Sequence, residues 1–270
     1  MAATKARPEQ NRICNLVPTP EASTKSDWQV THARMARLLA ARPAAPASLD
    51  LRRAWWTVGD QGDTGSCVGW ASTDGVARQM FVTAKRLPQS SGLSPRFTWM
   101  ASKETDEFTS RPETMIEGAG TTLKAAVDVL RKYGAVPEAL LPFTIDTAMY
   151  RGDGDTFYAT AATRKIASYF NLKRDISSWR DWLFQHGPIL VGVNVDATWD
   201  KATTTKGELD TYQPDTVRGG HAVAVVGYTA DGSFIIRNSW GTGWGDKGFG
   251  YASESYISAA FFNESYGVTL

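Results

Sequence analysis

The sequence predicts an α+β fold in which a helical lobe is followed by a lobe of antiparallel strands. Apolar residues recur at helical spacing in the first half of the chain. Short β-branched runs, separated by Gly, Asp and Thr clusters, dominate the second half. We expect the helical lobe at about residues 60–150 and the β lobe at about residues 160–260. The seam between the two lobes is the natural place for a cleft.

The N-terminal segment, residues 1–47, differs from the rest and is interpreted as an arm. It is rich in Pro, Ala, Thr and basic side chains, and it contains one helix-like stretch at 30–39. The Pro-rich stretch 42–47 resists helix formation and favours an extended chain. We therefore predict a boundary after residue 47 and one folded domain over residues 48–270.

Two helices are predicted in the first half of the folded domain. The first spans 66–87, follows a Gly-rich turn and places its N-terminus at Cys67. The second spans 122–133, carries its apolar residues on one face and is capped by Gly134. The helical lobe is expected to be built around these two elements.

Three short β-rich runs follow in the second half, at 189–195, 222–227 and 233–237. The clusters of Gly, Asp and Thr between them are typical of turns. The pattern predicts antiparallel strands, and no internal repeat interrupts it.

Composition and charge exclude several functional classes. A hydrophobic content of 42% with 21% charged residues is ordinary for a soluble globular protein. The 29 basic and 28 acidic side chains leave a net charge of +1, so there is no single-signed field to hold a phosphate backbone or an anionic membrane. We expect a monomer without a nucleic-acid or membrane partner.

Cysteine usage points to a reducing compartment. The chain has two cysteines, Cys14 and Cys67, which cannot form a disulfide framework, and it carries no metal-binding motif, so no metal and no cofactor are expected. The N-terminus lacks the apolar core of a signal peptide. We expect a cytoplasmic protein, or one exported without a recognisable signal peptide.

Cys67 is the first candidate for chemistry. It lies where the Gly-rich turn becomes a helix, so unpaired N–H groups and the positive end of the helix dipole favour its thiolate. The competing interpretation is a buried structural cysteine, which is the commoner fate of a single free thiol. The other motifs of the chain decide between these two interpretations.

Three segments occur in the order expected of one enzyme family. Residues 60–67 (DQGDTGSC) resemble the papain signature around the nucleophile, 220–228 (GHAVAVVGY) look like its histidine strand, and 237–249 (RNSWGTGWGDKGF) look like its asparagine segment. The chain is thus similar to papain-like cysteine peptidases of the bacterial type without disulfides. The resemblance extends over about residues 50–255. It implies a two-lobe papain-like fold with the active site in the cleft.

The resemblance assigns a role to each residue of the catalytic set. Cys67 is the nucleophile, His221 the acid and base, Asn238 the group that orients the imidazole, and Gln61 a donor of the oxyanion hole. A cysteine beside an imidazole can form a thiolate–imidazolium pair that attacks a peptide carbonyl and then protonates the leaving amine. The implied activity is that of a cysteine endopeptidase acting through an acyl-enzyme thioester.

A substrate peptide is expected to lie extended along the seam. The expected binding residues are the glycine-containing strip and two residues beside the catalytic set: Gly118, Ala119, Gly120, Thr121, Gly220 and Trp240. In the family, the tryptophan at the place of Trp240 shields the His–Asn contact from water. The sequence departs from the family at Thr64, where secreted relatives carry a disulfide cysteine, and at Val68, where an aromatic residue is usual.

Alternatives remain at this point. An acyl transferase or peptide ligase would use the same thioester with an amine in place of water. A peptide-binding module without catalysis would be of a different class, and the complete set of Cys, His and Asn argues against it. His32 lies in the polar arm and His186 is expected to end a helix, so neither is expected to be catalytic.

The arm carries its own hypothesis. We expect it to act as a propeptide or lid that lies across the cleft and blocks the site in part, which would make the protein a zymogen inhibited by its own N-terminal segment. The competing interpretation is a floppy tail. A sharper version has Cys14 reach Cys67 as a redox lock, although a reducing compartment disfavours it.

Overall fold

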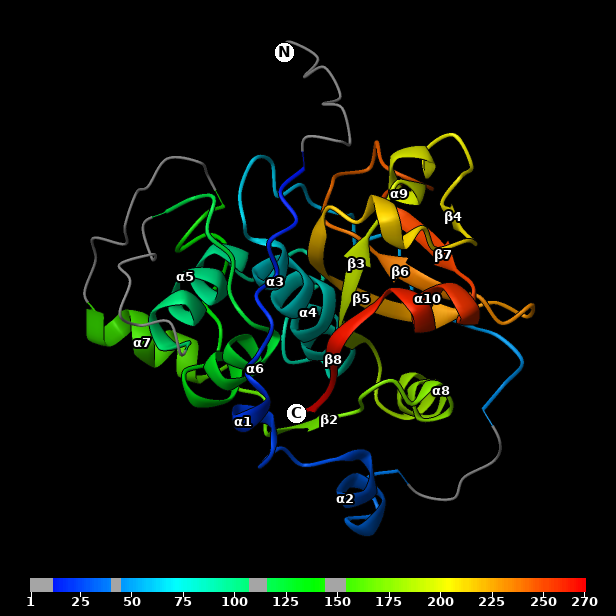
Figure 1. Ribbon diagram of the computed structural model, residues 1–270. Helices are drawn as coiled ribbons and strands as arrows, with labels where there is room; N and C mark the ends of the chain where they lie inside the picture. The colour runs from blue at the N-terminus through cyan, green and yellow to red at the C-terminus, as the bar shows by residue number, and fades with distance from the viewer. Residues whose placement is uncertain (1–11, 40–44, 107–115, 144–153) are drawn as a thin grey trace.

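The computed structural model describes residues 12–39, 45–106, 116–143 and 154–270. Helices gather on one side of the molecule and a sheet on the other, and the segment that starts at residue 12 runs over the seam between them (Figure 1). This is the two-lobe α+β arrangement that the sequence predicts. Among the described residues, no helix has both the length and the apolar character needed to cross a membrane.

The helical lobe is built around one continuous helix. It begins as α3 (Cys67–Gly69), widens into a π-helical stretch (Trp70–Ala77) and ends as α4 (Arg78–Thr83). The predicted start at Cys67 is confirmed. The helix ends before the predicted residue 87 because Lys85 adopts a left-handed backbone (φ 58°), which lets Arg86 N–H bond back to the Phe81 carbonyl.

Three further helices complete this lobe: α5 (Pro95–Thr105), α6 (Leu123–Lys132) and α7 (Gly154–Ala162). The α6 helix is the one predicted over 122–133. Its first turn is capped by Thr122, whose hydroxyl accepts the Ala125 N–H at 3.0 Å, and its end is followed by Gly134 in a left-handed conformation (φ 93°).

The sheet has its strands in the order β2-β8-β3-β5-β6-β7-β4, with β1 paired to β5. All pairs are antiparallel except β4 with β7. The strands are β1 (Leu49–Asp50), β2 (Ser168–Asn171), β3 (Ile189–Val195), β4 (Glu208–Leu209), β5 (Gly219–Tyr228), β6 (Phe234–Arg237), β7 (Phe249–Ala252) and β8 (Phe261–Thr269). The three predicted runs correspond to β3, β5 and β6.

The remaining short elements lie around the sheet and in the arm. They are α8 (Ile176–Gln185), α9 (Thr198–Lys201), α10 (Glu254–Ala260), a 3-10 turn (Pro214–Thr216), α1 (Glu21–Thr24) and α2 (Val30–Met35). His186 follows the last turn of α8, as predicted. The helix-like stretch at 30–39 is helical only to Met35, after which Arg37 takes a left-handed backbone (φ 57°).

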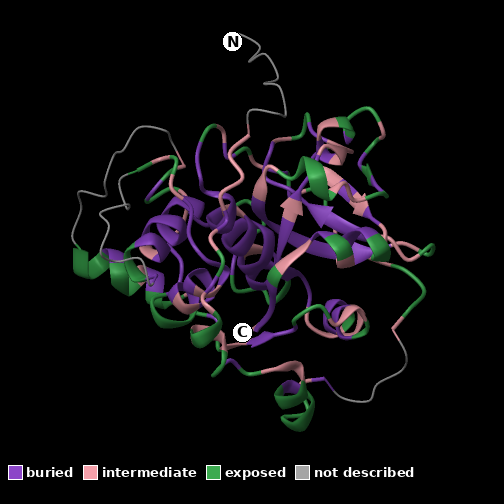
Figure 2. Ribbon diagram, viewed as in Figure 1, coloured by how far each residue is buried: buried purple, intermediate pink, exposed green. Residues whose placement is uncertain are grey.

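Strand β5 is buried on both faces, and this fixes where the two lobes meet. Ala222, Ala224 and Val226 face the helices, whereas Val223 and Val225 face a second apolar cluster on the other side of the sheet. The central helix approaches this strand at Gly75, where a Cβ would lie 2.8 Å from that of Ala224. Figure 2 shows the buried interior continuing from the central helix into the sheet.

The arm is ordered from residue 12 to residue 39. Its α2 helix and the turn after it pack on the sheet lobe, where Ala33 and Leu39 join an apolar cluster with Trp179 and Trp182. The His186 ring nitrogen Nε2 lies 2.6 Å from the Leu38 carbonyl oxygen. The arm therefore wraps around the folded domain over these residues and is not a floppy tail.

Candidate active site

Cys67 lies fully buried at the first residue of α3. Burial raises the pKa of its thiol to about 11, although the backbone N–H groups of Ala222, Val68 and Cys67 itself pull it down in part. The helix start thus acts in the expected direction but is outweighed by loss of water. The predicted preference for the thiolate therefore does not hold for this buried thiol.

His221 and Asn238 meet where β5 and the end of β6 lie side by side. The His221 Nε2 atom lies 2.7 Å from Asn238 Oδ1, and both side chains are buried. The other ring nitrogen, Nδ1, has no hydrogen-bond partner among the described residues. Burial lowers the pKa of His221 to about 4, so the ring is neutral near pH 7. One imidazole nitrogen is oriented and the other is left for a reacting group.

Tryptophans enclose the His–Asn contact. The ring of Trp240 lies 5.0 Å from that of His221, centre to centre, and is 2% exposed, as the resemblance implies for a shielding tryptophan. The ring of Trp199 lies 5.6 Å from His221 and meets it edge to face. Sequence reasoning missed Trp199 because no matching motif surrounds it; its only signal was a bulky apolar residue after the predicted strand at 189–195.

Gln61 is held in place from both ends of its amide. Its Oε1 accepts the Ser239 hydroxyl at 2.7 Å, and its Nε2 donates to the Thr64 carbonyl at 2.9 Å. The backbone N–H of Gln61 also donates to the Ser239 carbonyl at 2.8 Å. The segment after Asn238 therefore orients Gln61 as well, which ties the donor to the His–Asn pair.

The predicted binding strip, Gly118 to Thr121, borders the helical lobe beside Cys67. The Gly65 N–H donates to the Glu117 carbonyl at 2.8 Å, and the Trp99 indole N–H donates to the Ala119 carbonyl at 3.0 Å. The Thr121 hydroxyl donates to Asp106 at 2.9 Å. These bonds fix the strip as one wall of the seam.

The arm occupies this seam. The Leu16 N–H donates to the Gly220 carbonyl at 2.9 Å, and the Val17 N–H donates to the Thr121 carbonyl at 3.1 Å. The Asn15 side-chain amide donates to the Gly118 carbonyl. Every one of these acceptors was predicted to bind a peptide. The arm thus binds where an extended substrate was expected.

Three further contacts place the arm against the catalytic set and its neighbours. The Ile13 carbonyl accepts from Gln61 Nε2 at 3.3 Å. The Arg12 guanidinium bonds the Asp60 carboxylate at 2.5 Å and the Trp240 carbonyl at 3.3 Å. The Gln61 amide, which was assigned as a hydrogen-bond donor to the oxyanion, therefore already donates to a carbonyl of the arm.

The other histidines lie away from this set. His32 caps the start of α2, where its Nδ1 accepts the Gln29 N–H at 2.9 Å, and His186 contacts Leu38. In the described part of the chain no group of three His, Cys, Asp or Glu side chains could hold a metal ion. The chemistry that the site offers is that of a thiol, an imidazole and two amides.

Comparison with known proteins gives one family. Residues 45–261 match the family described as papain family cysteine protease. A cysteine protease of Blomia tropicalis is 29% identical over 209 residues, covering 75% of this chain and 59% of the relative. A cathepsin L-like proteinase of Fasciola hepatica is 25% identical over 213 residues, covering 76% and 60%. The chain thus spans about 60% of the length of these curated relatives.

Solved structures share the fold. Xylellain, a cysteine protease from Xylella fastidiosa, superposes with a TM-score of 0.74 at 24% identity and covers 100% of this chain and 99% of its own. Digestive procathepsin L 3 from Tenebrio molitor gives a TM-score of 0.64 at 23% identity, covering 86% and 72%. At these identities the likeness speaks for the fold alone.

Proposed function

The chain belongs to the papain family of cysteine proteases, and from that premise we propose that it is a cysteine endopeptidase held latent by its own N-terminal arm. The observation that carries the proposal is the position of residues 12–17. Their backbone and side chains bond to the same carbonyls, and to the same Gln61 amide, that an extended peptide would need. The arm thus excludes substrate from the seam.

The open site would act through a thiolate–imidazolium pair. When the arm leaves, water reaches the buried thiol and ring, and the desolvation that favours their neutral forms is relieved. Proton transfer from Cys67 to the Nδ1 atom of His221 then gives the nucleophile. Asn238 holds Nε2, which fixes the tautomer and the plane of the ring.

The steps of peptide hydrolysis follow from this arrangement. The Cys67 sulfur attacks the carbonyl carbon, and the oxygen gains charge beside Gln61 Nε2 and the Cys67 backbone N–H. The imidazolium then gives its proton to the departing amine, which leaves an acyl thioester on Cys67. Water, deprotonated by His221, attacks the thioester and releases the acid.

The arm blocks this sequence twice. Its backbone fills the seam, and the Ile13 carbonyl holds the Gln61 donor. The side chain of Leu16 adds to the block, since it is 4% exposed and packs with Leu123 and Phe262. The arm therefore buries a branched apolar side chain in the seam.

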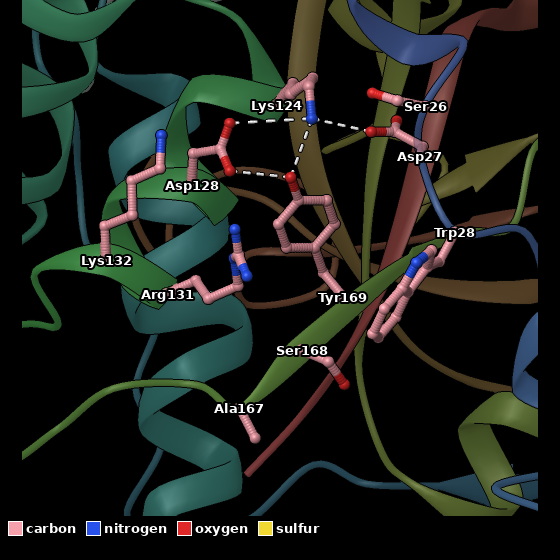
Figure 3. A pocket seen from close by; sticks show the side chains of 10 residues that line it. All are labelled: Ser26, Asp27, Trp28, Lys124, Asp128, Arg131, Lys132, Ala167, Ser168 and Tyr169. Atoms are coloured by element: carbon pink, nitrogen blue, oxygen red, sulfur yellow. Dashed lines mark hydrogen bonds and ion pairs between the residues drawn. The ribbon is translucent and has the colours of Figure 1, made fainter. Parts of the chain in front are cut away.

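A second attachment lies beyond the cleft, at Asp27. Its carboxylate accepts from Lys124 Nζ at 2.7 Å, from the Tyr266 hydroxyl at 2.9 Å and from the Asn171 amide at 3.3 Å. A surface pocket lies at this attachment, and Figure 3 shows the arm residues Ser26, Asp27 and Trp28 on one side of it and Lys124 and Tyr169 on the other. The arm is therefore held on both sides of the segment that covers the catalytic set.

The test is to lift the arm with one substitution. Leu16→Asp replaces buried apolar contact by a carboxylate, which should weaken arm docking by about 2 kcal/mol or more. Turnover of a fluorogenic peptide should then rise at least ~10-fold over the wild type. A chain beginning at Ser48 should be at least as active.

Two controls distinguish inhibition by the arm from the reactivity of Cys67. Met35→Ala, on the exposed side of α2, should leave turnover at the wild-type level. A peptidyl epoxide should add once to Cys67 in the opened chain and not at all to Leu16→Asp that also carries Cys67→Ala. Equal labelling of wild type and Leu16→Asp would show that the arm does not inhibit the site. If a folded, opened chain took up no epoxide, the proposed peptidase activity would be wrong.

A further inference from the structure

We propose that Cys14 and Cys67 form a reversible disulfide that fastens the arm in the cleft and protects the nucleophile from irreversible oxidation. The inference rests on the proposed latent peptidase and adds a redox input to it. It assigns a function to Cys14, the one thiol that the catalytic mechanism does not use.

Cys14 is fixed at the level of the catalytic set by bonds on either side of it. The preceding residue, Ile13, gives its carbonyl to Gln61, and Leu16 gives its N–H to the carbonyl of Gly220, the neighbour of His221. The carbonyl of Cys14 itself lies against Gly219, where any Cβ would collide with it. The backbone at Cys14 therefore has little freedom to move away from the cleft.

Both thiols are free; Cys67 is buried, and Cys14 is half-buried. Cys67 belongs to the apolar cluster between the central helix and the sheet, whereas Cys14 packs against the cluster on the other face, so the Cys14 side chain has to turn towards Cys67 for a bond to form. Burial raises the pKa of Cys14 to about 12, and the charge of a Cys67 thiolate adds to this rise. Arg218 acts in the opposite direction and favours a thiolate at Cys14. A disulfide requires Cα atoms about 4.4–6.8 Å apart, so the arm has to close on Cys67 to this distance when the bond forms.

The reaction balances with a peroxide as oxidant. In the opened state the Cys67 thiolate attacks one oxygen of hydrogen peroxide; the O–O bond breaks, and after proton transfer Cys67 sulfenic acid and one water result. When the arm returns, the Cys14 sulfur attacks the sulfenic sulfur. The S–O bond breaks, a second water leaves, and the S–S bond forms. A dithiol reductant reverses the product to two thiols by exchange.

The alternative fate of Cys67 is further oxidation. Without a thiol close by, a sulfenic acid reacts with more peroxide to the sulfinic acid, which dithiols do not reduce. Cys14 would thus act as a resolving cysteine carried by the inhibitory segment. Formation of the disulfide would thus inactivate Cys67 reversibly and protect it from irreversible oxidation.

Peptide mapping without reductant tests the inference on the full chain. Trypsin releases Cys14 in peptide 13–25 and Cys67 in peptide 54–78. After hydrogen peroxide treatment, the wild-type monomer should lose about 2 Da and yield these two peptides linked. Cys14→Ser should yield no linked pair, and its peptide 54–78 should gain about 32 Da as sulfinic acid.

Recovery gives the second readout. After peroxide and then dithiothreitol, epoxide labelling of Cys67 should return to within about twofold of the untreated wild type, whereas Cys14→Ser should regain less than about a tenth. Equal sulfinic acid in wild type and Cys14→Ser, with no linked peptides, would overturn the inference. A different result would be linked peptides together with no epoxide labelling of the reduced Leu16→Asp chain. It would support the disulfide and contradict the proposed peptidase activity.

Discussion

Gln61 shows how a single side chain is prepared for catalysis by its neighbours. Its amide is oriented by Ser239 and Thr64, and its Nε2 already holds a carbonyl, that of Ile13. In the proposed mechanism such a donor is set before any substrate arrives, so it would stabilise an oxyanion without reorganising. The resemblance predicted Gln61, but the Ser239 hydroxyl that aims it could not be inferred, because their contact bridges 178 positions of sequence.

Replacing Gln61 in an opened chain tests this role. Gln61→Ala on the Leu16→Asp background should lower kcat/KM by about 10²–10³, which corresponds to ~3 kcal/mol of transition-state stabilisation. Because the thiol is untouched, iodoacetamide alkylation of Cys67 should stay within about twofold. A parallel loss of alkylation and turnover would show that Gln61 supports the thiol rather than the oxyanion. Steady-state kinetics and mass spectrometry on the same samples give both values.

Burial holds Cys67 and His221 in their neutral forms. Burial raises the pKa of Cys67 to about 11 and lowers that of His221 to about 4, so both are neutral at pH 7 when the cleft is closed. The sequence pointed to the thiolate because a helix start favours it. Desolvation by the surrounding fold could not be read from the local motif.

Alkylation across pH distinguishes the two states. In the wild type, reaction of Cys67 with iodoacetamide should rise about tenfold per pH unit from pH 7 towards the thiol pKa of about 11, as the thiolate fraction grows. In Leu16→Asp, the raised Cys67 pKa should fall and the lowered His221 pKa should rise, which gives a faster and flatter profile around pH 7. Superimposable profiles would show that the arm does not set these pKa values.

At the scale of elements, the central helix and the sheet are joined by buried charge as well as by apolar packing. Asp74, on the π-helical stretch, pairs with Arg78 at 2.9 Å and with Arg237 at the end of β6. Arg237 is 3% exposed, lies over the ring of Trp56 and donates to the Thr57 carbonyl at 2.9 Å. This pair fixes the strand end from which Asn238 follows.

Asp74→Ala should therefore be costly, since it leaves a buried guanidinium without its carboxylate. We expect the free energy of unfolding to fall by about 3–5 kcal/mol in urea denaturation. The matched control is Asp215→Ala, at an exposed turn, which should change it by no more than about 0.5 kcal/mol. A small loss for Asp74→Ala would mean that Arg237 remains satisfied by its backbone carbonyls alone.

Local patterns predicted the elements that have clear boundaries and missed those that depend on tertiary partners. The strand at Ile189–Val195 and the helix that ends before Gly134 carry strong β-branched and capping signals. Strand β8 lies between β2 and β3, yet its sequence includes Asn263, Glu264 and Ser265. Glu264 is buried there, where the Thr19 hydroxyl of the arm donates to it. No local pattern reveals such a partner.

At the scale of the whole molecule, the arm forms hydrogen bonds with both lobes and is attached on both sides of the cleft. Arg12 holds one side at Asp60, and Asp27 holds the other through three donors. The sequence predicted an arm and a block. It could not predict the second anchor, because Lys124, Asn171 and Tyr266 lie on three separate elements.

Loosening the second anchor should activate the enzyme in part. Asp27→Asn removes the charge that pairs with Lys124 and should cost about 1.5–3 kcal/mol of arm docking. Epoxide labelling of Cys67 should then become ~5-fold faster or more. Asp128→Asn serves as control, because Asp128 bonds Tyr169 on the folded domain beside the same Lys124. Labelling that is equally fast in both variants would point to a general loosening of α6.

The glycines along the seam restrict more than the arm. A Cβ at Gly65 or Gly120 would collide with Asn15, and one at Gly219 with the backbone of Cys14, so at these points the seam holds one extended main chain and little more. A polypeptide can enter it only as a single extended thread, and a folded domain cannot. Cleavage of a folded substrate protein would therefore require local unfolding of that substrate. The cleavage rate would then depend on how often the substrate unfolds locally more than on the sequence at the cleaved bond.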